Sequence, residues 1–175
     1  MSFYLPHHPV IGAKLRVMFD GSFQDRDGRS LNDSLHIGPC IQRNLFKVCL
    51  RFLMHRFVFS ADIVKMFRQI SVTPEHQNFQ GILWREDPEE PLKHYKLTIV
   101  TYVTACAPFL AVRVLEQLAV YDEYEFPRAA RILLDDFYVD DVMTGAMNKQ
   151  ELLDIKEELV LLMPRAKLEF SKRGK

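Results

Sequence analysis

The sequence predicts an α+β fold in which an antiparallel sheet is backed by helices. Short runs rich in aromatic and β-branched residues, which favour strands, alternate with longer stretches in which apolar residues recur at helical spacing. The chain has 175 residues, and 48% of them are hydrophobic, which is enough to form a core. We therefore expect one domain, or two small subdomains that share a core.

The first part of the chain is predicted to be mostly extended. Residues 1–11 contain prolines and histidines and lack any helical pattern. Charged and apolar side chains alternate over residues 14–19, which predicts a strand with a basic outer face. A polar turn is expected at 25–28, and the Gly-Pro pair at 38–39 should end the short segment that follows it.

A helix and a strand are predicted next. The helix covers residues 45–55, where apolar side chains share one face: Leu45, Val48, Cys49, Phe52 and Leu53. Residues 57–62 then alternate between two faces, as expected of a strand. Asp62 ends this otherwise apolar strand, where an unpaired charge is costly.

A second hairpin and a long helix are predicted in the middle of the chain. Residues 80–84 and 95–100 have strand character, and the loop at 87–91 between them is rich in proline and acidic residues. The helix covers residues 105–120, in which one stripe is apolar: Phe109, Val112, Leu115 and Ala119.

The last part of the chain should add helices and one more strand. Pro127 is well placed at the start of a helix over 128–134. Asn148 can cap a further helix, which Pro164 should end. Residues 167–170 have the character of a final strand.

Residues 136–145 are typical of a hairpin with two acids at its turn. Residues 137–139 and 142–144 suit strands, and Asp140 and Asp141 lie between them, where a turn should fall. Two like charges side by side cost electrostatic energy unless a cation joins them. Mg²⁺ takes oxygen ligands of this kind, often one or two carboxylates with a substrate phosphate. A solvated turn without a ligand is the alternative.

Asp62 supplies a third carboxylate for the same place. If the strand that it ends lies beside the acidic hairpin, the three carboxylates can hold two divalent cations and support in-line phosphoryl transfer. Taken alone, Asp62 would more often be a cap for the turn that follows it. The two stretches together favour a catalytic site.

Two short motifs resemble the carboxylate motifs of reverse transcriptases: Ala61-Asp62 followed by Phe67, and Tyr138-Val139-Asp140-Asp141. The residues around them are similar to those of the BEL/Pao group of LTR retrotransposons. The supporting runs occur in the family's order and span nearly the whole chain: residues 4–10, 14–22, 62–70, 100–102 with 107–113, and 136–145.

This resemblance implies an RNA-directed DNA polymerase that works by two-metal catalysis. Asp62, Asp140 and Asp141 would be both its catalytic residues and its metal ligands, with Asp141 in an assisting role. The implied cofactor is a pair of Mg²⁺ ions, for which Mn²⁺ could substitute. The implied partners are an RNA or DNA template with its primer and deoxynucleoside triphosphates.

The resemblance also implies five nucleotide-binding residues: Lys14, Arg16, Ile63, Phe67 and Tyr102. The two basic residues match a strand that contacts the triphosphate, although a basic strand face is usually only solvated. Phe67 matches a bulky residue beneath the sugar that excludes a ribose 2′-hydroxyl, whereas composition alone would make it a core residue. Tyr102 matches a residue that stacks near the template base and the incoming nucleotide.

The same resemblance divides the chain into partial fingers, residues 1–56 and 71–100, and a palm, residues 57–70 and 101–175, without a thumb. Val103 stands where the family usually has glycine, which could hinder close approach of the backbone to the nucleotide. We therefore expect a truncated enzyme, separated from the thumb and RNase H regions of a parental polyprotein.

Three other functions are compatible with parts of the sequence. The chain could be a catalytically impaired or co-opted retroelement remnant that binds nucleic acid or is inert. A palm of an RNA-dependent RNA polymerase would be better served by a residue smaller than Phe67 near the sugar. A metal phosphatase could use the same carboxylates, but it leaves the ordered flanking motifs unexplained.

Composition limits the remaining possibilities. The formal net charge is zero, so any nucleic-acid site must be a local basic patch. The three cysteines are widely separated and form no metal-binding pair, which favours a reduced, intracellular setting over secretion. The N-terminus lacks a signal-peptide pattern, and the longest apolar run, over residues 99–120, is interrupted by proline and charged residues, so no membrane association is expected.

Overall fold

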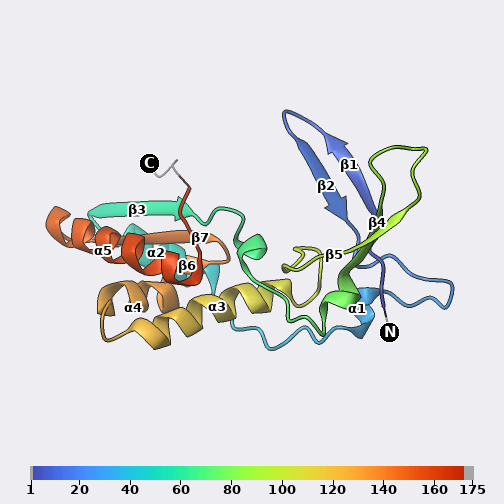
Figure 1. The fold of residues 1–175 in the computed structure, drawn as a ribbon. Helices are drawn as coiled ribbons and strands as arrows, with labels where there is room; N and C mark the ends of the chain where they lie inside the picture. Colours follow the sequence, from blue (N-terminus) through green and yellow to red (C-terminus); the bar gives the residue numbers. More distant parts are fainter. Residues whose placement is uncertain (1, 172–175) are drawn as a thin grey trace. The chain divides into compact units, whose positions relative to one another are not determined.

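The structure is a computed structural model that describes residues 2–171 (Figure 1). It confirms the predicted α+β class with antiparallel sheets and helices. The chain forms two compact units. The first unit comprises the residues up to Gly38 and Ile70–Ala107, and the second comprises Pro39–Gln69 and the residues from Pro108 onward.

Two antiparallel hairpins make up most of the first unit. Strands β1 (His7–Ile11) and β2 (Leu15–Phe19) form one hairpin, and β4 (Gly81–Trp84) and β5 (Lys93–Lys96) form the other. The short helix α1 (Leu31–Ser34) begins at a capping box, in which Ser30 and Asp33 satisfy each other's backbone N–H groups.

The second hairpin differs from its prediction at 95–100. Strand β5 ends at Lys96, because the residues after it bond to a different partner. The N–H of Val72 donates to the carbonyl of Thr98, and the N–H of Val100 donates to the carbonyl of Ile70. The backbone groups of this segment are therefore satisfied by the stretch at 70–72 rather than by β4.

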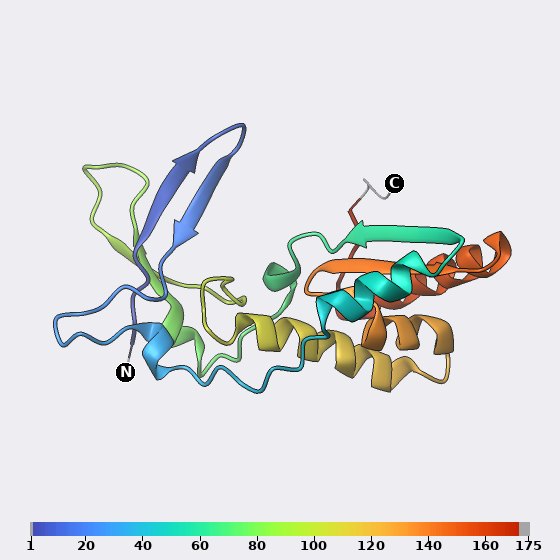
Figure 2. The same cartoon turned by 180° about the vertical axis from the view of Figure 1, so that it is seen from behind.

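The second unit is built on an antiparallel sheet with the strand order β3, β7, β6. Its strands are β3 (Phe57–Asp62), β6 (Phe137–Tyr138) and β7 (Asp141–Ala146). The accompanying helices are α2 (Leu45–Leu53), α3 (Ala107–Asp122), α4 (Pro127–Asp135) and α5 (Lys149–Leu162). Helices α2 and α5 both pack against β7, the central strand of this sheet (Figures 1 and 2).

Alternate residues of β7 form the centre of the core in the second unit. Val142, Thr144 and Ala146 are buried, and helix α5, which packs against this strand, has buried side chains such as Leu159. The alternation has the period of two that a strand requires, so one face of β7 is committed to the core. This commitment fixes which way the other residues of the strand point.

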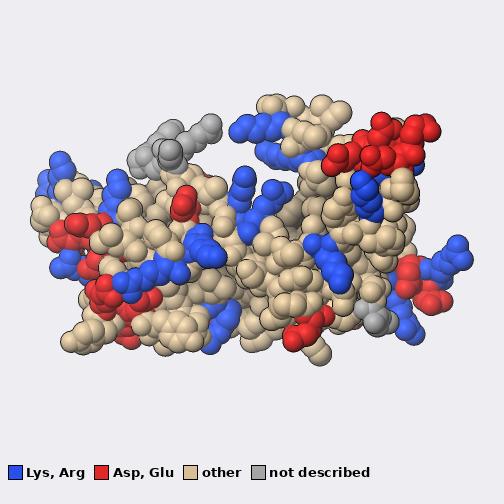
Figure 3. All heavy atoms as spheres, in the orientation of Figure 1, with Lys and Arg blue, Asp and Glu red and all other residues tan. Residues whose placement is uncertain are grey.

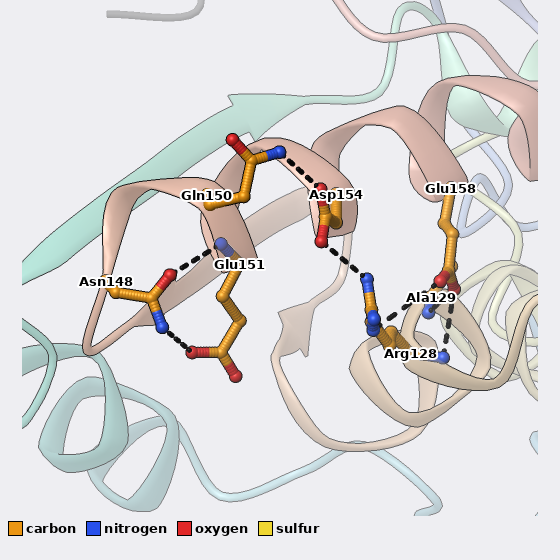
Figure 4. Close-up of polar contacts among 7 residues, drawn as sticks. All are labelled: Arg128, Ala129, Asn148, Gln150, Glu151, Asp154 and Glu158. Atoms are coloured by element: carbon orange, nitrogen blue, oxygen red, sulfur yellow. Dashed lines mark hydrogen bonds and ion pairs between the residues drawn. The ribbon is translucent and has the colours of Figure 1, made fainter.

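Side chains of helix α5 hold the start of helix α4 (Figure 4). A carboxylate oxygen of Glu158 accepts from the backbone N–H groups of Arg128 and Ala129, both at 3.0 Å, and the Arg128 guanidinium pairs with Asp154 at 3.1 Å. Asn148 caps α5 itself by accepting from the N–H of Glu151 at 2.8 Å, as predicted. Glu158 thus satisfies two backbone N–H groups that the first turn of α4 leaves open.

The C-terminal part confirms one prediction and contradicts another. Helix α5 ends at Leu162, just before Pro164, and a 3-10 turn over Met163–Ala166 follows, with the proline near its start, where a missing N–H costs nothing. Residues 167–170 do not form a strand of their own. Lys167 has a left-handed backbone with φ of 58°, and only Phe170 makes a β-bridge, to Ile63.

Gly145 in β7 lies where no side chain fits. A Cβ atom added there would lie 2.5 Å from the Phe57 carbonyl oxygen and 2.6 Å from the Cβ of His55. We predict that Gly145→Ala lowers the free energy of unfolding by about 2 kcal/mol, because the strand and its neighbour must move apart. Urea denaturation measures this loss. Gly12→Ala is the matched control, since nothing lies within 4 Å of its added Cβ, and equal losses in both variants would contradict the prediction.

Candidate active site

The acidic hairpin turns one residue earlier than predicted. Tyr138 pairs with Asp141, so the turn consists of Val139 and Asp140, and Asp141 is the first residue of β7. Val139 has φ of 56°, a left-handed conformation that a β-branched side chain adopts only at a cost. Strain of this kind is typical of functional turns.

Gln42 supports the strained turn. Its side-chain oxygen accepts from the N–H of Val139 at 3.1 Å, and its side-chain nitrogen donates to the carbonyl of Phe137 at 3.3 Å. Sequence reasoning missed this residue, because it lies far from the hairpin in the chain and belongs to no motif.

The pairing of β3 with β7 brings the three acids to one end of the sheet. Asp62 is the direct antiparallel partner of Asp141. The N–H of Ile63 donates to the carbonyl of Asp140 at 2.8 Å, which joins the end of β3 to the turn. Side chains of directly opposed residues lie on the same face of a sheet. The pairing therefore places Asp62 beside Asp141, next to the turn that contains Asp140.

The charges at this end of the sheet perturb one another. Partial burial, followed by the nearby charges of Asp140 and Asp62, raises the pKa of the Asp141 carboxyl above its ordinary value. Asp141 as a whole is exposed, so burial is incomplete, and the like charges are the cause specific to this site. A cation between the carboxylates would relieve this repulsion.

The carboxylates suit a hard divalent cation by the chemistry of their oxygen atoms, but the three side chains do not converge on one point. Within residues 2–171, no group of three His, Cys, Asp or Glu side chains is placed to hold a metal ion. Mg²⁺ needs only one or two protein carboxylates, because substrate phosphates and water complete its octahedral shell. Asp62 and the hairpin acids supply enough donors of the right kind for that arrangement.

Asp62 has a hydrogen-bond partner of its own. The Ser171 hydroxyl donates to Oδ1 of Asp62 at 2.6 Å. The backbone N–H of Ser171 also donates to the carbonyl of Asp62 at 2.8 Å. Sequence reasoning missed Ser171, which lies far from Asp62 in the chain and has no spacing that would mark it.

Asp136, just before β6, is a buried carboxylate with a structural role. Its Oδ1 accepts from Nε of Arg51 at 2.9 Å, and its Oδ2 accepts from the Thr144 hydroxyl at 2.7 Å. Only 8% of Asp136 is exposed, so both partners are needed to offset the desolvation of the charge. This network ties helix α2 to strand β7 and the start of the acidic hairpin.

Two of the predicted nucleotide-binding residues lie close to the carboxylates along the chain. Ile63 is buried and contributes its backbone N–H to Asp140, as described above. Phe67 is half-buried in a 3-10 turn over Met66–Gln69. The residue before that turn, Lys65, has a left-handed backbone with φ of 50°.

The other three predicted nucleotide-binding residues belong to the first unit. Lys14 is exposed in the turn before β2, and Arg16 is exposed within β2. The Tyr102 hydroxyl donates to Sδ of Met18 at 3.0 Å, so Tyr102 packs beside the same strand. The structure thus gathers Arg16 and Tyr102 around β2, while the carboxylates lie in the other unit.

Val103 is accommodated at the position where glycine was expected. Its φ is not positive, so the backbone there does not need glycine. Its carbonyl accepts from the side-chain nitrogen of Asn32 at 3.1 Å and lies against Gly21, where an added Cβ would come within 2.9 Å of that oxygen. The absence of a side chain at Gly21 therefore allows the Val103 carbonyl to pack closely against it.

The charges on the visible face in Figure 3 are mixed, with Lys and Arg interspersed among Asp and Glu. A dense acidic group lies at the tip of the second hairpin and consists of Glu86, Asp87, Glu89 and Glu90. Within residues 2–171, no helix is long and apolar enough to cross a membrane.

Solved structures of foamy virus protease–reverse transcriptase share this fold. A complex of the foamy viral protein with an RNA/DNA hybrid has a TM-score of 0.73 and 17% identity, with 99% of this chain and 21% of that chain covered. A selenomethionine-labelled CSH mutant of the prototype foamy virus protein has a TM-score of 0.74 at 17% identity, covering 98% and 20%. A dRH form bound to double-stranded DNA has a TM-score of 0.70 at 18% identity, covering 98% and 27%.

The fold is reverse transcriptase-like. The chain spans about a fifth to a quarter of the length of these neighbours. At such low identity the likeness establishes the fold and leaves the BEL/Pao subgroup a prediction. No protein-family model and no curated protein matches the sequence.

The raised pKa of Asp141 gives a prediction about stability. A carboxyl whose pKa is raised by folding favours the folded state at low pH, and this benefit is lost as the pH rises through its folded pKa. Asp141→Asn should therefore stabilise the chain at pH 7, by about 0.5 kcal/mol for a charge this exposed. The gain should shrink as the pH falls toward the ordinary value of 3.8.

Urea denaturation between pH 7 and pH 4 tests this prediction. Glu157→Gln, on the exposed side of helix α5, is the control for removal of a carboxylate elsewhere in the same unit. A destabilised Asp141→Asn variant at pH 7, or a gain that does not depend on pH, would contradict the proposed repulsion.

Proposed function

We propose that this chain is the fingers–palm part of an RNA-directed DNA polymerase from a BEL/Pao-type LTR retrotransposon. The observation that carries the proposal is the pairing of Asp62 with Asp141 beside the strained turn that holds Asp140. Asp62 and the adjacent pair Asp140 and Asp141, which come from two distant parts of the sequence, lie at one end of the sheet in a chain with a reverse transcriptase-like fold. The partial fingers would be residues 1–56 and 71–100 and the palm residues 57–70 and 101–175, whereas the two compact units divide the chain after Gly38, Gln69 and Ala107.

Asp62 and Asp140 would hold the metal ions, and Asp141 would assist. When bound, two Mg²⁺ ions would activate the primer 3′-hydroxyl and neutralise charge on the triphosphate and the leaving pyrophosphate. The carboxylates contribute fixed negative charge at the end of a rigid sheet, and positioning of this kind carries phosphoryl transfer without a covalent intermediate. The pairing of the ends of β3 and β7 supports this role, because it would hold the backbone of these acids in place before substrate binds.

The remaining predicted residues would bind the nucleotide and template. Arg16 has the guanidinium geometry that suits phosphate, and Lys14 adds a second positive charge. Tyr102, 37% exposed beside β2, presents a ring that could stack on a base. Phe67 would lie beneath the sugar and exclude the ribose 2′-hydroxyl.

The proposed partners are a primed RNA or DNA template and deoxynucleoside triphosphates. Two of the solved neighbours hold an RNA/DNA hybrid and double-stranded DNA, respectively, which supports nucleic acid as the ligand class. Thumb and RNase H regions of a parental polyprotein would be further partners of this chain. An intracellular location is also proposed, in keeping with Cys40, Cys49 and Cys106, which are unpaired among the described residues.

A catalytically impaired or co-opted remnant is the second candidate function. The observation that favours it is that the three carboxylates do not converge into a metal-binding group within residues 2–171. Such a chain would keep the fold and could bind nucleic acid without extending a primer. The two candidates therefore differ in metal-dependent activity.

Primer extension separates the two candidates. We predict extension of a primed template with Mg²⁺ or Mn²⁺, and a loss of roughly 100-fold or more in Asp140→Asn, because the charge that holds the metal is removed. Glu157→Gln, which removes a carboxylate elsewhere in the same unit, should extend normally. Absence of extension with either metal would favour the remnant, and full activity in Asp140→Asn would refute the proposed site.

The sugar preference tests the role of Phe67. Phe67→Ala should raise the ratio of ribonucleotide to deoxynucleotide incorporation about tenfold or more, since the ring no longer meets the 2′-hydroxyl; this estimate equals roughly 1.4 kcal/mol of lost discrimination. Phe46→Ala, with a ring 70% exposed on helix α2, is the matched control. An unchanged ratio in Phe67→Ala would show that Phe67 is only a packing residue.

A further inference from the structure

We propose that Ser171 is a positioning residue that orients the Asp62 carboxylate for a divalent cation. This inference rests on the proposed function, because it adds a residue to the same metal site. Ser171 would not touch substrate or metal. It would act by holding one oxygen of Asp62 so that the other faces the cation.

Main-chain contacts place Ser171 beside Asp62. The N–H of Val64 donates to the carbonyl of Glu169 at 2.8 Å, Phe170 forms a β-bridge with Ile63, and the N–H of Ser171 donates to the carbonyl of Asp62 at 2.8 Å. This segment therefore runs antiparallel to the end of β3, on the edge that β7 does not occupy.

Packing anchors the same segment. The Phe170 ring contacts that of Phe59 edge-on at 5.9 Å and stacks on that of Phe137 at 6.4 Å, and Leu168 is completely buried. Aromatic pairs of this geometry add to the stability gained from burial. The position of Ser171 is thus fixed by its neighbours and does not depend on its own side chain.

The hydroxyl makes one short bond to one carboxylate oxygen. Ser171 Oγ lies 2.6 Å from Oδ1 of Asp62, a length typical of a hydroxyl that donates to an ionised carboxylate. A serine hydroxyl has one hydrogen to donate, so Oδ2 keeps its lone pairs for another partner. Asp62 is exposed at the strand end, where this bond restricts a side chain that solvent would otherwise leave free to rotate.

Hydrogen bonds of this kind generally matter for metal affinity. Carboxylates that bind metals are commonly held by a second hydrogen bond, and its removal typically weakens metal binding 10–100-fold. The backbone contacts of Ser171 do not involve its hydroxyl, so replacing the side chain separates the positioning role from the structural one. Ser171→Ala should keep the β-bridge and lose only the bond to Asp62.

Mn²⁺ binding to the chain without substrate provides a readout independent of catalysis. Free Mn²⁺, counted by electron paramagnetic resonance during a titration, gives the dissociation constant for each variant. We expect Ser171→Ala to bind Mn²⁺ about tenfold more weakly. Ser171→Thr keeps a hydroxyl and should recover most of the affinity. Ser60→Ala removes an exposed serine of β3 whose side chain makes no hydrogen bond to residues 2–171, and it should bind like the wild type.

The outcomes distinguish failure of the proposed role of Ser171 from failure of the proposed metal site. One outcome overturns the role of Ser171 and leaves the metal site standing. In it, the wild type binds Mn²⁺ and Asp140→Asn abolishes this binding, but Ser171→Ala binds Mn²⁺ at least as tightly as the wild type. If the wild type binds no Mn²⁺, the metal site fails and the role of Ser171 fails with it. Equal urea midpoints for Ser171→Ala and wild type verify that a loss of affinity is not a loss of folding.

Discussion

The register between β3 and β7 is the constraint on which the candidate site depends. Side chains alternate along a strand, so a slip of one residue would move Asp62 to the opposite face from its present one. Two features of β7 prevent the slip. Val142, Thr144 and Ala146 must face the core, and Gly145 must lie where the Phe57 carbonyl leaves no room for a side chain. The packing of the second unit thus determines where its acids meet.

The second unit contains two kinds of carboxylate, one that stabilises the fold and one that is available to a ligand. Asp136 is buried, paired with Arg51 and bonded by Thr144, so its charge is fully compensated and stabilises the fold around it. The acids of the hairpin tip have no such compensation: neither the Asp140 nor the Asp141 side chain makes a hydrogen bond to residues 2–171, and partial burial together with the neighbouring charges raises the pKa of Asp141. Uncompensated like charges on a strained turn are typical of a functional site.

Much of this arrangement could be predicted from the sequence, because its causes are local. The strand before Asp62, the helix that Asn148 caps and the helix that Pro127 begins follow from periodicity and end signals. The turn was misplaced by one residue for a physical reason. A valine is disfavoured at positive φ, and only the tertiary contacts of Gln42 and the neighbouring strand hold Val139 there.

Three residues that support the candidate site were not predicted, for a different reason. Gln42, Arg51 and Ser171 act on partners far away in the chain, and no spacing rule connects them to those partners. Residues 97–100 and 167–170 were assigned to the wrong elements for the same reason, since their backbone partners lie at 70–72 and at the end of β3. Sequence patterns therefore pointed to the acidic residues of the candidate site, and the contacts around them became visible only in the folded chain.

The most direct test of the account is to locate a bound cation. A crystal of the chain soaked in Mn²⁺ should show an anomalous density peak between the Asp62 carboxylate and the turn formed by Val139 and Asp140. Oxygen atoms of Asp62 and of at least one hairpin acid should lie within bonding distance of that peak. A peak elsewhere on the molecule, or an Asp62 carboxylate that stays remote from the hairpin acids at saturating Mn²⁺, would contradict the account.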